Sequence, residues 1–340
     1  MSENEQINVV VSIDFSEEIM ARIRDVSPKL NVEQHFPDIP QSVWATTEIL
    51  YTIRNFPNPE DVPRLRWIQL NYAGLESVLK RRITQEALDV MITSASGIHA
   101  TQIANYCLMM MLAFNYKLPK MLEFQKQSTW AKNRYEIFNP TDMNKQTLGL
   151  VGYGSIARET ARLAHQLGMT VLASKRDAMK TAENETDYTP EDTGDPQGVI
   201  PERIYPGEAL ATMAQECDYL VVTVPLTEDT KHMINSRVLE AMKPNAVLIN
   251  IARGGVVDEK ALITTLSQEK IKGAALDVFE EEPLPSSSPL WQLDNVIISP
   301  HVSGNTDDYH EKAADLFIAN LKRYLDRKPL YNQLNTETGY

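Results

Sequence analysis

The sequence predicts an α/β protein of two domains, the second of which is built on a doubly wound, mostly parallel sheet. Three observations lead to this prediction. Short apolar runs alternate with helix-length amphipathic stretches, a pattern typical of parallel sheets. The rhythm restarts at Leu148, directly before a glycine-rich turn, VGYGSIA, at residues 151–157. A chain of 340 residues is also too long for one small core, so two domains are expected.

In the first hundred residues, the expected strands are short and are separated by helical patterns or by proline-rich turns. They are Ile7–Ile13, Ile49–Thr52, Trp67–Leu70 and Val90–Thr93. A long helical pattern then runs from Thr101 to Leu118, and Pro119 is expected to close it.

From Leu148 onward, six apolar runs with helices between them predict one doubly wound domain. The expected strands are Leu148–Val151, Thr170–Ala173, Tyr219–Val224, Ala246–Asn250, Ala274–Leu276 and Val296–Ser299. The last helical pattern, Asp307–Leu325, has no strand after it and is expected to pack back against the N-terminal domain.

The stretch from Asp177 to Tyr205 does not fit this rhythm. It is rich in Thr, Glu, Asp, Pro and Gly and has no apolar periodicity. A surface loop or short arm inserted after the second strand of the domain is therefore expected. A substrate lid or an oligomer contact are the alternatives, and no residue in the stretch demands either.

The composition excludes several classes of protein. A formal net charge of −13 argues against a nucleic-acid partner, which requires a basic face. The longest apolar run, Cys107–Phe114, is too short to span a bilayer, so no membrane partner is expected. The first residues resemble no secretory signal, and Cys107 and Cys217 are interpreted as buried, reduced thiols with no disulfide and no metal site. We therefore expect a cytoplasmic protein.

The glycine-rich turn has the context of a dinucleotide-binding site, with an apolar strand before it and a helix after it. Gly152 permits the tight turn, and Gly154 lets the backbone approach a pyrophosphate. Ala157 stands at the third position, where glycine is usual, and is still small enough for close helix–strand packing. The pyrophosphate is expected at the helix N-terminus, where free N–H groups and the helix dipole favour an anion.

The end of the second strand of this domain indicates which coenzyme is bound. An acidic residue about 20 positions past the glycines normally binds the ribose of NAD. Here the sequence has Ser174, Lys175 and Arg176, and the first carboxylate is Asp177. Two cations and a hydroxyl suit a 2′-phosphate, so NADP(H) is favoured. NAD(H) bound through Asp177 remains the alternative.

Three polar residues with catalytic chemistry, Arg253, Glu282 and His301, each follow an apolar, strand-like run. They lie in the stretches NIARGG (250–255), DVFEEEP (277–283) and SPHVSG (299–304). A carbonyl that accepts hydride needs a fixed cation and a proton donor beside it. Arg253 supplies the cation, His301 the proton, and Glu282 an acidic partner that favours the protonated imidazole.

Each of these residues alone has a simpler interpretation, as a surface arginine, a solvated acidic run or a loop histidine. Their joint position at the carboxyl ends of strands in a nucleotide-binding sheet favours the catalytic interpretation. The other histidines lack such a setting and are interpreted as structural or exposed; they are His35, His99, His165, His232 and His310.

These stretches, together with VPLT (224–227) and Thr230, resemble the D-isomer-specific 2-hydroxyacid dehydrogenase family, in particular its glyoxylate/hydroxypyruvate reductase-like members. The resemblance runs from about Asn71 to Leu325. It implies a Rossmann-type domain, residues 103–304, inserted into a smaller flavodoxin-like substrate-binding domain made of residues 1–102 and 305–340. It also implies a homodimer that pairs through the cofactor domain, with the helix segment Cys107–Leu112 at the interface.

The resemblance adds further site residues. Asp277 is implied near the nicotinamide carboxamide, and Trp130 resembles a tryptophan that reaches a neighbouring subunit's site, a buried core tryptophan being the alternative. The implied substrate-binding residues are Tyr72, Ala73, Gly74, Arg253 and His301. The full expected cofactor set is Gly152, Tyr153, Gly154, Ser155, Ile156, Ser174, Lys175, Arg176, Val224, Pro225, Thr230, Ile251, Ala252, Asp277 and Gly304.

The sequence therefore predicts an NAD(P)-dependent D-2-hydroxyacid dehydrogenase or 2-ketoacid reductase. Hydride passes between the nicotinamide and a small 2-keto or D-2-hydroxy acid, while His301, paired with Glu282, handles the proton. The alternative is a non-catalytic NAD(P)-sensing, corepressor-like protein on the same fold, although a sensor has no need of a proton donor.

Overall fold

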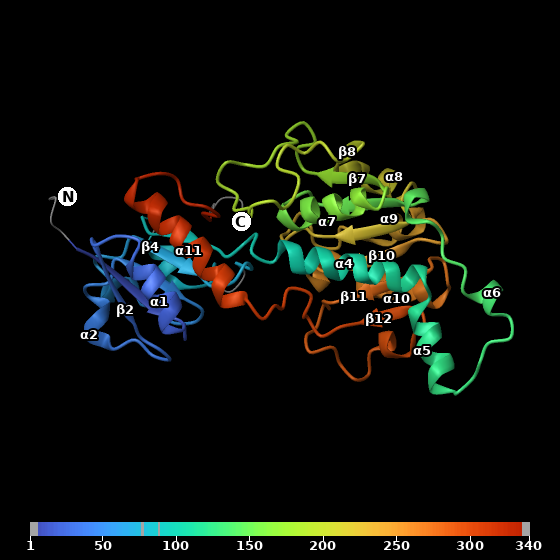
Figure 1. Ribbon diagram of the computed structural model, residues 1–340, viewed down its shortest axis with the longest axis horizontal. Helices are drawn as coiled ribbons and strands as arrows, with labels where there is room; N and C mark the ends of the chain where they lie inside the picture. Colours follow the sequence, from blue (N-terminus) through green and yellow to red (C-terminus); the bar gives the residue numbers. More distant parts are fainter. Residues whose placement is uncertain (1–5, 76–77, 88, 335–340) are drawn as a thin grey trace. The chain divides into compact units, whose positions relative to one another are not determined.

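The computed structural model describes residues 6–75, 78–87 and 89–334. The chain divides into two compact units (Figure 1). The first comprises Met1–Ile98, Asn184–Pro190 and Thr306–Tyr340, and the second comprises His99–Glu183 and Glu191–Asn305.

The first unit contains a five-stranded parallel sheet with the order β2-β1-β3-β4-β5. This order, 2-1-3-4-5, is the flavodoxin-like doubly wound arrangement. Its strands are β1 (Ile7–Ser12), β2 (Leu30–Gln34), β3 (Ile49–Thr52), β4 (Trp67–Leu70) and β5 (Met91–Thr93). Its helices are α1 (Glu17–Arg24), α2 (Gln41–Trp44), the 3₁₀ helix η1 (Pro59–Asp61), α3 (Arg82–Glu86) and α11 (Tyr309–Leu325).

The second unit contains a seven-stranded parallel sheet with the order β12-β11-β10-β9-β6-β7-β8. Counted from β6, the order is 7-6-5-4-1-2-3, which contains the Rossmann arrangement. Its strands are β6 (Thr147–Val151), β7 (Thr170–Lys175), β8 (Arg203–Pro206), β9 (Tyr219–Val222), β10 (Val247–Asn250), β11 (Gly273–Leu276) and β12 (Val296–Ile298). The expected fold class is confirmed.

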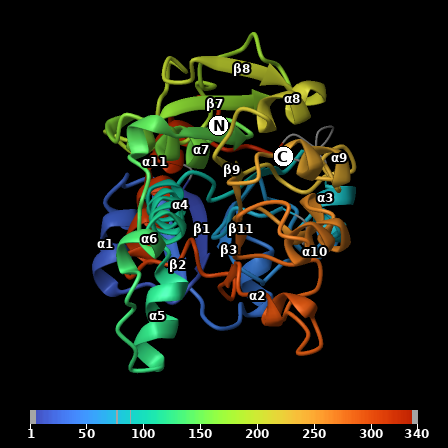
Figure 2. The ribbon, with the colours of Figure 1, turned by 90° about the vertical axis from the view of Figure 1, so that its right-hand side faces the viewer.

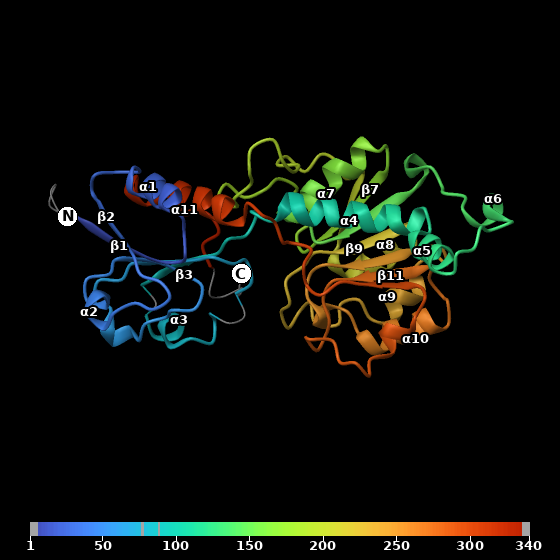
Figure 3. The same ribbon diagram turned by 60° about the horizontal axis from the view of Figure 1, so that its bottom comes forward.

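Helices cover both faces of this second sheet. One face packs against α4 (Ala100–Asn115) and α7 (Ser155–Gln166), which lie side by side in Figures 1 and 3. The other face packs against α8 (Leu210–Ala214), α9 (Ser236–Ala241) and α10 (Glu259–Ser267). The remaining elements are α5 (Leu118–Lys126), α6 (Arg134–Ile137), η2 (Met143–Lys145), η3 (Gly207–Ala209), η4 (Gly254–Val256) and η5 (Pro289–Gln292).

All ten predicted strands are present, with ends within two residues of those expected. Two strands, β2 and β8, were not predicted, and both lie at a sheet edge, as Figure 2 shows for β8 beside β7. An edge strand has one unpaired side and needs no apolar run, and Pro206 is tolerated as the last residue of β8 because the strand pairing ends there.

The long helix expected over Thr101–Leu118 is in fact two helices. Helix α4 ends at Asn115, Lys117 adopts a left-handed conformation with φ +56°, and α5 begins at Leu118. Pro119 therefore lies in the first turn of α5 instead of closing α4. Proline is favoured there because its missing N–H is not needed at a helix start.

The C-terminal helix α11 completes the first unit, as expected. Its Phe317 is fully buried and contacts the rings of Tyr51 (4.5 Å between centroids) and Trp67 (5.4 Å). Asn320, also fully buried, donates to the Gln69 Oε1 atom at 3.2 Å. This helix therefore contributes both apolar and polar contacts to the core of a domain that begins some 300 residues earlier.

The insertion over 177–205 is not simply a surface loop, and part of it is anchored on the second unit. Asp195 is buried, and its carboxylate accepts a hydrogen bond from the Tyr153 hydroxyl at 2.6 Å. The guanidinium of Arg158, 1% exposed, donates to the backbone oxygen atoms of Asp195 and Thr181. The insertion then ends in β8, so it also extends the sheet.

A second part of the insertion, Asn184–Pro190, belongs to the first unit. There the Asn332 backbone N–H donates to the Thr186 oxygen at 2.8 Å, and the Tyr188 N–H donates to the Asn332 side chain at 3.0 Å. Gly97, with φ +91°, leaves room for the Tyr188 carbonyl, which would lie 2.1 Å from a Cβ atom at that position. The chain therefore passes between the two units four times.

Candidate active site

The candidate catalytic residues all follow strands of the second unit at the carboxyl edge of its sheet. Arg253 follows β10, Asp277 follows β11 and His301 follows β12, and these three strands are neighbours. In open α/β sheets this edge is where ligands bind.

The Arg253 turn is fixed by the side chain of Asn250. Its Oδ1 atom accepts a hydrogen bond from the Ala252 N–H, and its Nδ2 atom donates to the Arg253 carbonyl oxygen, both at 3.2 Å. Arg253 itself is extended and half-buried, and its Nη1 atom donates to the Ala252 carbonyl oxygen at 2.7 Å. The backbone that carries the Arg253 side chain is therefore held in one conformation by Asn250.

The loop that carries Glu282 packs directly against this turn. A Cβ atom built on Gly254 would lie 1.8 Å from the Phe279 carbonyl carbon and 2.2 Å from the Glu280 nitrogen. Both neighbours are backbone atoms, so no side chain fits at position 254. This close approach holds the turn after Arg253 next to the loop that leads to Glu282.

Glu282 and His301 form a direct pair. The His301 Nδ1 atom lies 2.8 Å from Glu282 Oε2, while Glu282 Oε1 accepts the Phe279 N–H at 3.0 Å. A carboxylate only accepts hydrogen bonds, so Nδ1 carries the proton in this pair. Nε2 is then the ring nitrogen that can exchange a proton with a substrate, and both side chains are solvent-accessible.

His301 has a positive φ of +54°, a conformation that is uncommon for a residue with a side chain. Asp277 holds the turn in this conformation. Its backbone oxygen accepts the His301 N–H at 2.9 Å, and its carboxylate accepts the N–H groups of Val302 and Ser303, each also at 2.9 Å. The Ser299 hydroxyl donates to the same carboxylate at 2.6 Å.

Asp277 is fully buried, and these three donors account for both of its carboxylate oxygen atoms. The structure thus gives this residue a role in shaping the His301 turn. Its implied place beside a nicotinamide carboxamide stays a prediction.

The glycine-rich turn fits a dinucleotide. Gly152 has φ +94°, and its N–H donates to the Ser174 oxygen at 2.9 Å. A Cβ atom at Gly154 would meet no atom within 4 Å, so the space above this residue is open. The twelve-residue helix α7 begins at the next residue, so its free N–H groups suit the pyrophosphate of a coenzyme.

The side chain of Tyr153 has a structural role. Its ring is buried under the Arg158 guanidinium, 4.6 Å from the ring centroid, and its hydroxyl donates to Asp195. The side chain therefore anchors the insertion, and the expected contact of Tyr153 with a coenzyme stays a prediction. Ser155 and Ile156, predicted with it, form the first turn of α7.

The residues at the end of β7 differ in exposure. Ser174 is buried and Lys175 is half-buried, with its Nζ atom donating to the Lys180 carbonyl oxygen. Arg176 and Asp177 are exposed, and the Asp177 carboxylate accepts the Met179 N–H at 3.1 Å. Of Lys175 and Arg176, the arginine is therefore the more accessible cation for a 2′-phosphate.

The other expected cofactor residues surround the same edge of the sheet. Val224 lies against Gly152, where a Cβ atom would be 2.8 Å from its Cγ1 atom. Thr230 donates to the Pro225 oxygen at 2.6 Å and so shapes the loop after β9. Ile251 and Ala252 follow β10 and are buried, whereas the Gly304 oxygen lies 3.2 Å from His99 Nδ1.

The expected substrate loop lies in the first unit. Tyr72, Ala73 and Gly74 follow β4 after one intervening residue, Asn71, and are half-buried. The preceding Asn71 is buried, and its side chain accepts a hydrogen bond from the Tyr51 hydroxyl at 2.6 Å. The loop is thus anchored at its start.

The histidines outside the site have local partners or are exposed. His35 pairs with Glu33 at 3.0 Å, and His232 pairs with Glu280 at 2.9 Å. The His310 ring contacts Phe15, whereas His165 is exposed. Among the described residues, no cluster of side chains suitable for a metal ion was found.

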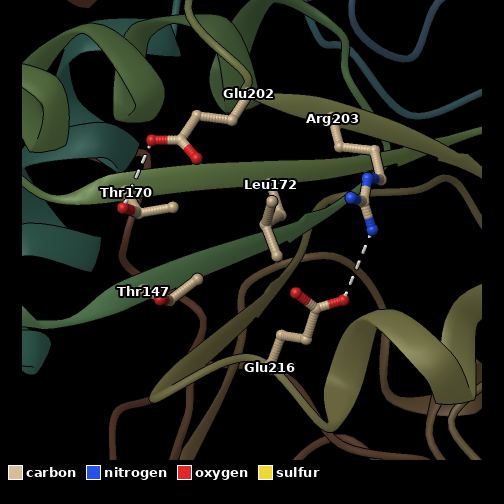
Figure 4. Close-up of a pocket in the computed structure, with 6 residues that line it drawn as sticks. All are labelled: Thr147, Thr170, Leu172, Glu202, Arg203 and Glu216. Carbon is tan, nitrogen blue, oxygen red and sulfur yellow. Dashed lines mark hydrogen bonds and ion pairs between the residues drawn. The ribbon is translucent and has the colours of Figure 1, made fainter.

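A small polar cavity of about 170 Å³ lies elsewhere on the second unit (Figure 4). Thr147, Thr170 and Arg203, which line it, are the first residues of β6, β7 and β8. The cavity is therefore at the amino-terminal edge of the sheet. The candidate catalytic residues lie at the opposite edge.

Three residues that shape the site were missed in the sequence. Asn250 sets the Arg253 turn, Ser299 binds Asp277, and the Tyr106 hydroxyl on α4 lies 2.6 Å from the Ser299 Oγ atom. Asn250 and Ser299 lie inside the quoted motifs, so their position beside Arg253 and His301 was a usable signal. The sequence around Tyr106 contains no motif that indicates its contact with Ser299, which is 193 positions away.

We expect the variant Gly154→Ala to keep the melting temperature of the parent protein but to bind coenzyme at least tenfold more weakly. The added methyl group meets no protein atom yet occupies the space in which the pyrophosphate approaches the backbone. Isothermal titration with NADPH and NADH measures the affinity. Gly152→Ala is the contrasting variant, because φ +94° and contacts below 3 Å should also lower its melting temperature. Unchanged coenzyme affinity in Gly154→Ala would contradict the assignment of this turn.

Comparisons with known proteins identify the family of this chain. Residues 108–303, more than half of the chain, match the family model described as D-isomer specific 2-hydroxyacid dehydrogenase, NAD binding domain. Glyoxylate reductase of Pyrococcus furiosus is 34% identical over 270 residues, which cover 77% of this chain and 73% of the relative. (S)-sulfolactate dehydrogenase of Chromohalobacter salexigens is 35% identical over 243 residues, covering 70% and 71%, respectively.

The fold comparison gives the same result. The crystal structure of a D-isomer specific 2-hydroxyacid dehydrogenase from Xanthobacter autotrophicus Py2, in complex with NADPH and MES, has a TM-score of 0.77 and 25% identity. The match covers 98% of this chain and 100% of that structure. The non-catalytic alternative finds no support among these relatives. On the family model, the relatives and the fold together, this chain belongs to the D-isomer-specific 2-hydroxyacid dehydrogenase family.

Proposed function

We propose that this protein reduces a small 2-keto acid to a D-2-hydroxy acid, with NADPH as the favoured hydride donor. The observation that carries the proposal is the His301–Glu282 pair at 2.8 Å, next to the Arg253 turn at the carboxyl edge of the sheet. The glycine-rich turn opens at this same edge, so a proton donor, a cation and a coenzyme site belong to one unit.

Each residue has a separate role in the reaction. When bound, the nicotinamide supplies the hydride to C2 of the keto acid. Arg253 binds the substrate carboxylate or carbonyl oxygen and stabilises the charge that develops there. His301 Nε2 donates a proton to the carbonyl oxygen, and Glu282 accepts the Nδ1 hydrogen bond and so orients the ring. In the reverse direction His301 acts as the base.

We expect His301→Ala to lower kcat by roughly 10² to 10⁴ because it removes general acid catalysis. The affinity for coenzyme should stay within about twofold of the parent value, since the glycine-rich turn is unchanged. Steady-state kinetics with glyoxylate, hydroxypyruvate and pyruvate measures the loss. His165→Ala, which replaces an exposed histidine on α7, is the control. Normal turnover of His301→Ala would exclude the proposed mechanism.

The preference for NADPH is supported by the two cations at the end of β7 and by the NADPH in the Xanthobacter structure. Arg176 is exposed and can bind a 2′-phosphate with two parallel hydrogen bonds. NAD(H) is the alternative coenzyme, because Asp177 is also exposed directly after Arg176.

We expect Arg176→Gln to raise the KM for NADPH by about tenfold while changing the KM for NADH little, since the loss of one charge-assisted contact affects only the phosphorylated ribose. Parallel assays with both coenzymes measure the effect. Lys180→Gln removes a nearby exposed charge and serves as the matched control. An unchanged KM for NADPH in Arg176→Gln would contradict the proposal that Arg176 binds the 2′-phosphate.

The substrate is proposed to be a short keto acid that carries a carboxylate. Arg253 is the group proposed to bind its carboxylate, and the role of the loop Tyr72–Gly74 stays a prediction from the sequence. The names of two relatives, glyoxylate reductase and (S)-sulfolactate dehydrogenase, support a small anionic substrate class. The panel of keto acids used for His301→Ala also tests this choice.

We propose that the protein forms a homodimer through α4, α5 and the segment that follows them. Within the expected interface helix, Cys107, Met110 and Met111 are buried against the sheet, so these residues are core and not interface. A group of apolar side chains nearby is exposed instead: Met109, Tyr116, Leu118, Met121, Leu122, Trp130 and Tyr135. Trp130, at 81% exposed, is therefore not a core tryptophan, and α5 and α6 project from the rest of their unit (Figures 1 and 3).

We expect sedimentation velocity to give a dimer for the parent protein and a monomer for Leu122→Glu, because a charge would be placed in a desolvated apolar contact. Leu167→Glu is the control, since Leu167 has comparable exposure at the end of α7. A parent protein that sediments as a monomer at micromolar concentration would refute the dimer.

A cytoplasmic location is proposed from the two buried cysteines, which form no disulfide. Among the described helices, none is long and apolar enough to cross a membrane. Cell fractionation that recovers the protein outside the cytoplasm would contradict this location.

A further inference from the structure

The turn that carries His301 is connected to helix α4 by a chain of three side chains. The Tyr106 hydroxyl lies 2.6 Å from Ser299 Oγ, which lies 2.6 Å from Asp277 Oδ1. Tyr106 and Asp277 are buried, and Asp277 has no exposed surface. All three residues belong to the second unit but come from distant parts of the sequence.

The direction of each hydrogen bond follows from the chemistry of the groups. The carboxylate of Asp277 can only accept, so the single hydroxyl proton of Ser299 is donated to it. Ser299 Oγ can then only accept from Tyr106, and the tyrosine must be the donor. Burial raises the pKa of Tyr106 to about 12, so this proton is retained at neutral pH. In such a chain, each hydrogen bond polarises and strengthens the next.

The end of the chain determines the geometry of His301. The Asp277 carboxylate binds the backbone N–H groups of Val302 and Ser303, and the Asp277 carbonyl oxygen binds the His301 N–H. His301 lies between these contacts at φ +54°. A backbone in this region persists only where its surroundings hold it, so a shift of the carboxylate would also shift the imidazole.

We infer that Tyr106 is a positioning residue for proton transfer by His301 and acts through Ser299 and Asp277. The inference rests on the proposed role of His301. Tyr106 has no part in binding either reactant. Its hydroxyl fixes the rotamer of Ser299, and the Ser299 hydroxyl completes the set of donors that orients the Asp277 carboxylate under the catalytic turn.

The test compares two buried tyrosine hydroxyl groups. Tyr106→Phe removes the donor of the chain, whereas Tyr219→Phe removes the hydroxyl that donates to the Met111 oxygen at 3.2 Å on the same helix. Burial raises the pKa of Tyr219 to about 12 as well, so the two side chains are closely matched. We expect Tyr106→Phe to lower kcat on the order of tenfold, with the KM for keto acid and the Kd for coenzyme within twofold. Tyr219→Phe should keep the parent kcat.

A double mutant distinguishes action through Ser299 from a general loss of packing. Ser299→Ala should lower kcat at least as much as Tyr106→Phe does. Ser299→Thr keeps the hydroxyl and should therefore retain most of the parent kcat. In the Ser299→Ala background, Tyr106→Phe should have no further effect on kcat, because the intermediate group is already missing. If Tyr106→Phe does not fold, a Ser299→Ala variant that keeps the parent kcat overturns the inference by itself, because the inference acts through Ser299.

The inference is overturned if Tyr106→Phe and Tyr219→Phe have the same kcat, if the coenzyme Kd rises in parallel with the loss of kcat, or if the effects of Tyr106→Phe and Ser299→Ala are additive. His301→Ala is measured alongside. An inactive His301→Ala with a fully active Tyr106→Phe removes this inference alone, whereas an active His301→Ala removes the proposed function itself.

Discussion

Every strand of the seven-stranded sheet runs in the same direction, and the arrangement of the candidate site depends on this constraint. Because the carboxyl ends of parallel strands share one edge, residues separated by about fifty positions in sequence lie at the same edge of the sheet. Arg253 follows β10, Glu282 lies in the loop after β11, and His301 follows β12. The glycine-rich turn follows β6 at the same edge. The small cavity lies at the opposite edge of the sheet from the candidate catalytic residues, so the position of a cavity alone does not identify the candidate site.

Backbone contacts then give these residues their geometry. Gly254 lets one loop lie against the backbone of the next, so the distance between the arginine turn and the acidic loop does not depend on flexible side chains. The positive φ of His301 has a conformational cost of about 1–3 kcal/mol, which the hydrogen bonds of Asp277 offset. Rigid loops on a rigid sheet are a requirement for acid–base catalysis, where small displacements have large effects on rate.

The sequence was sufficient for the buried strands, the glycine-rich turn and the three polar residues after strands, because each is marked by local apolar pattern or by a short motif. Edge strands β2 and β8 were missed since a half-paired strand needs no apolar run. The structural roles of Tyr106 and Arg158 could not be predicted, because each hydrogen-bonds to a residue that is distant in the chain. Asp277 was assigned to the coenzyme by resemblance, whereas the structure shows what its carboxylate binds within the protein.

The inserted segment Asn184–Pro190 docks on the first unit, while the chain on both sides of it is anchored in the second. Because the chain holds this segment at both ends, its effective concentration at Asn332 is high. The first unit is therefore assembled from three separate stretches of the chain, and the contact of Tyr188 with Asn332 joins residues 144 positions apart.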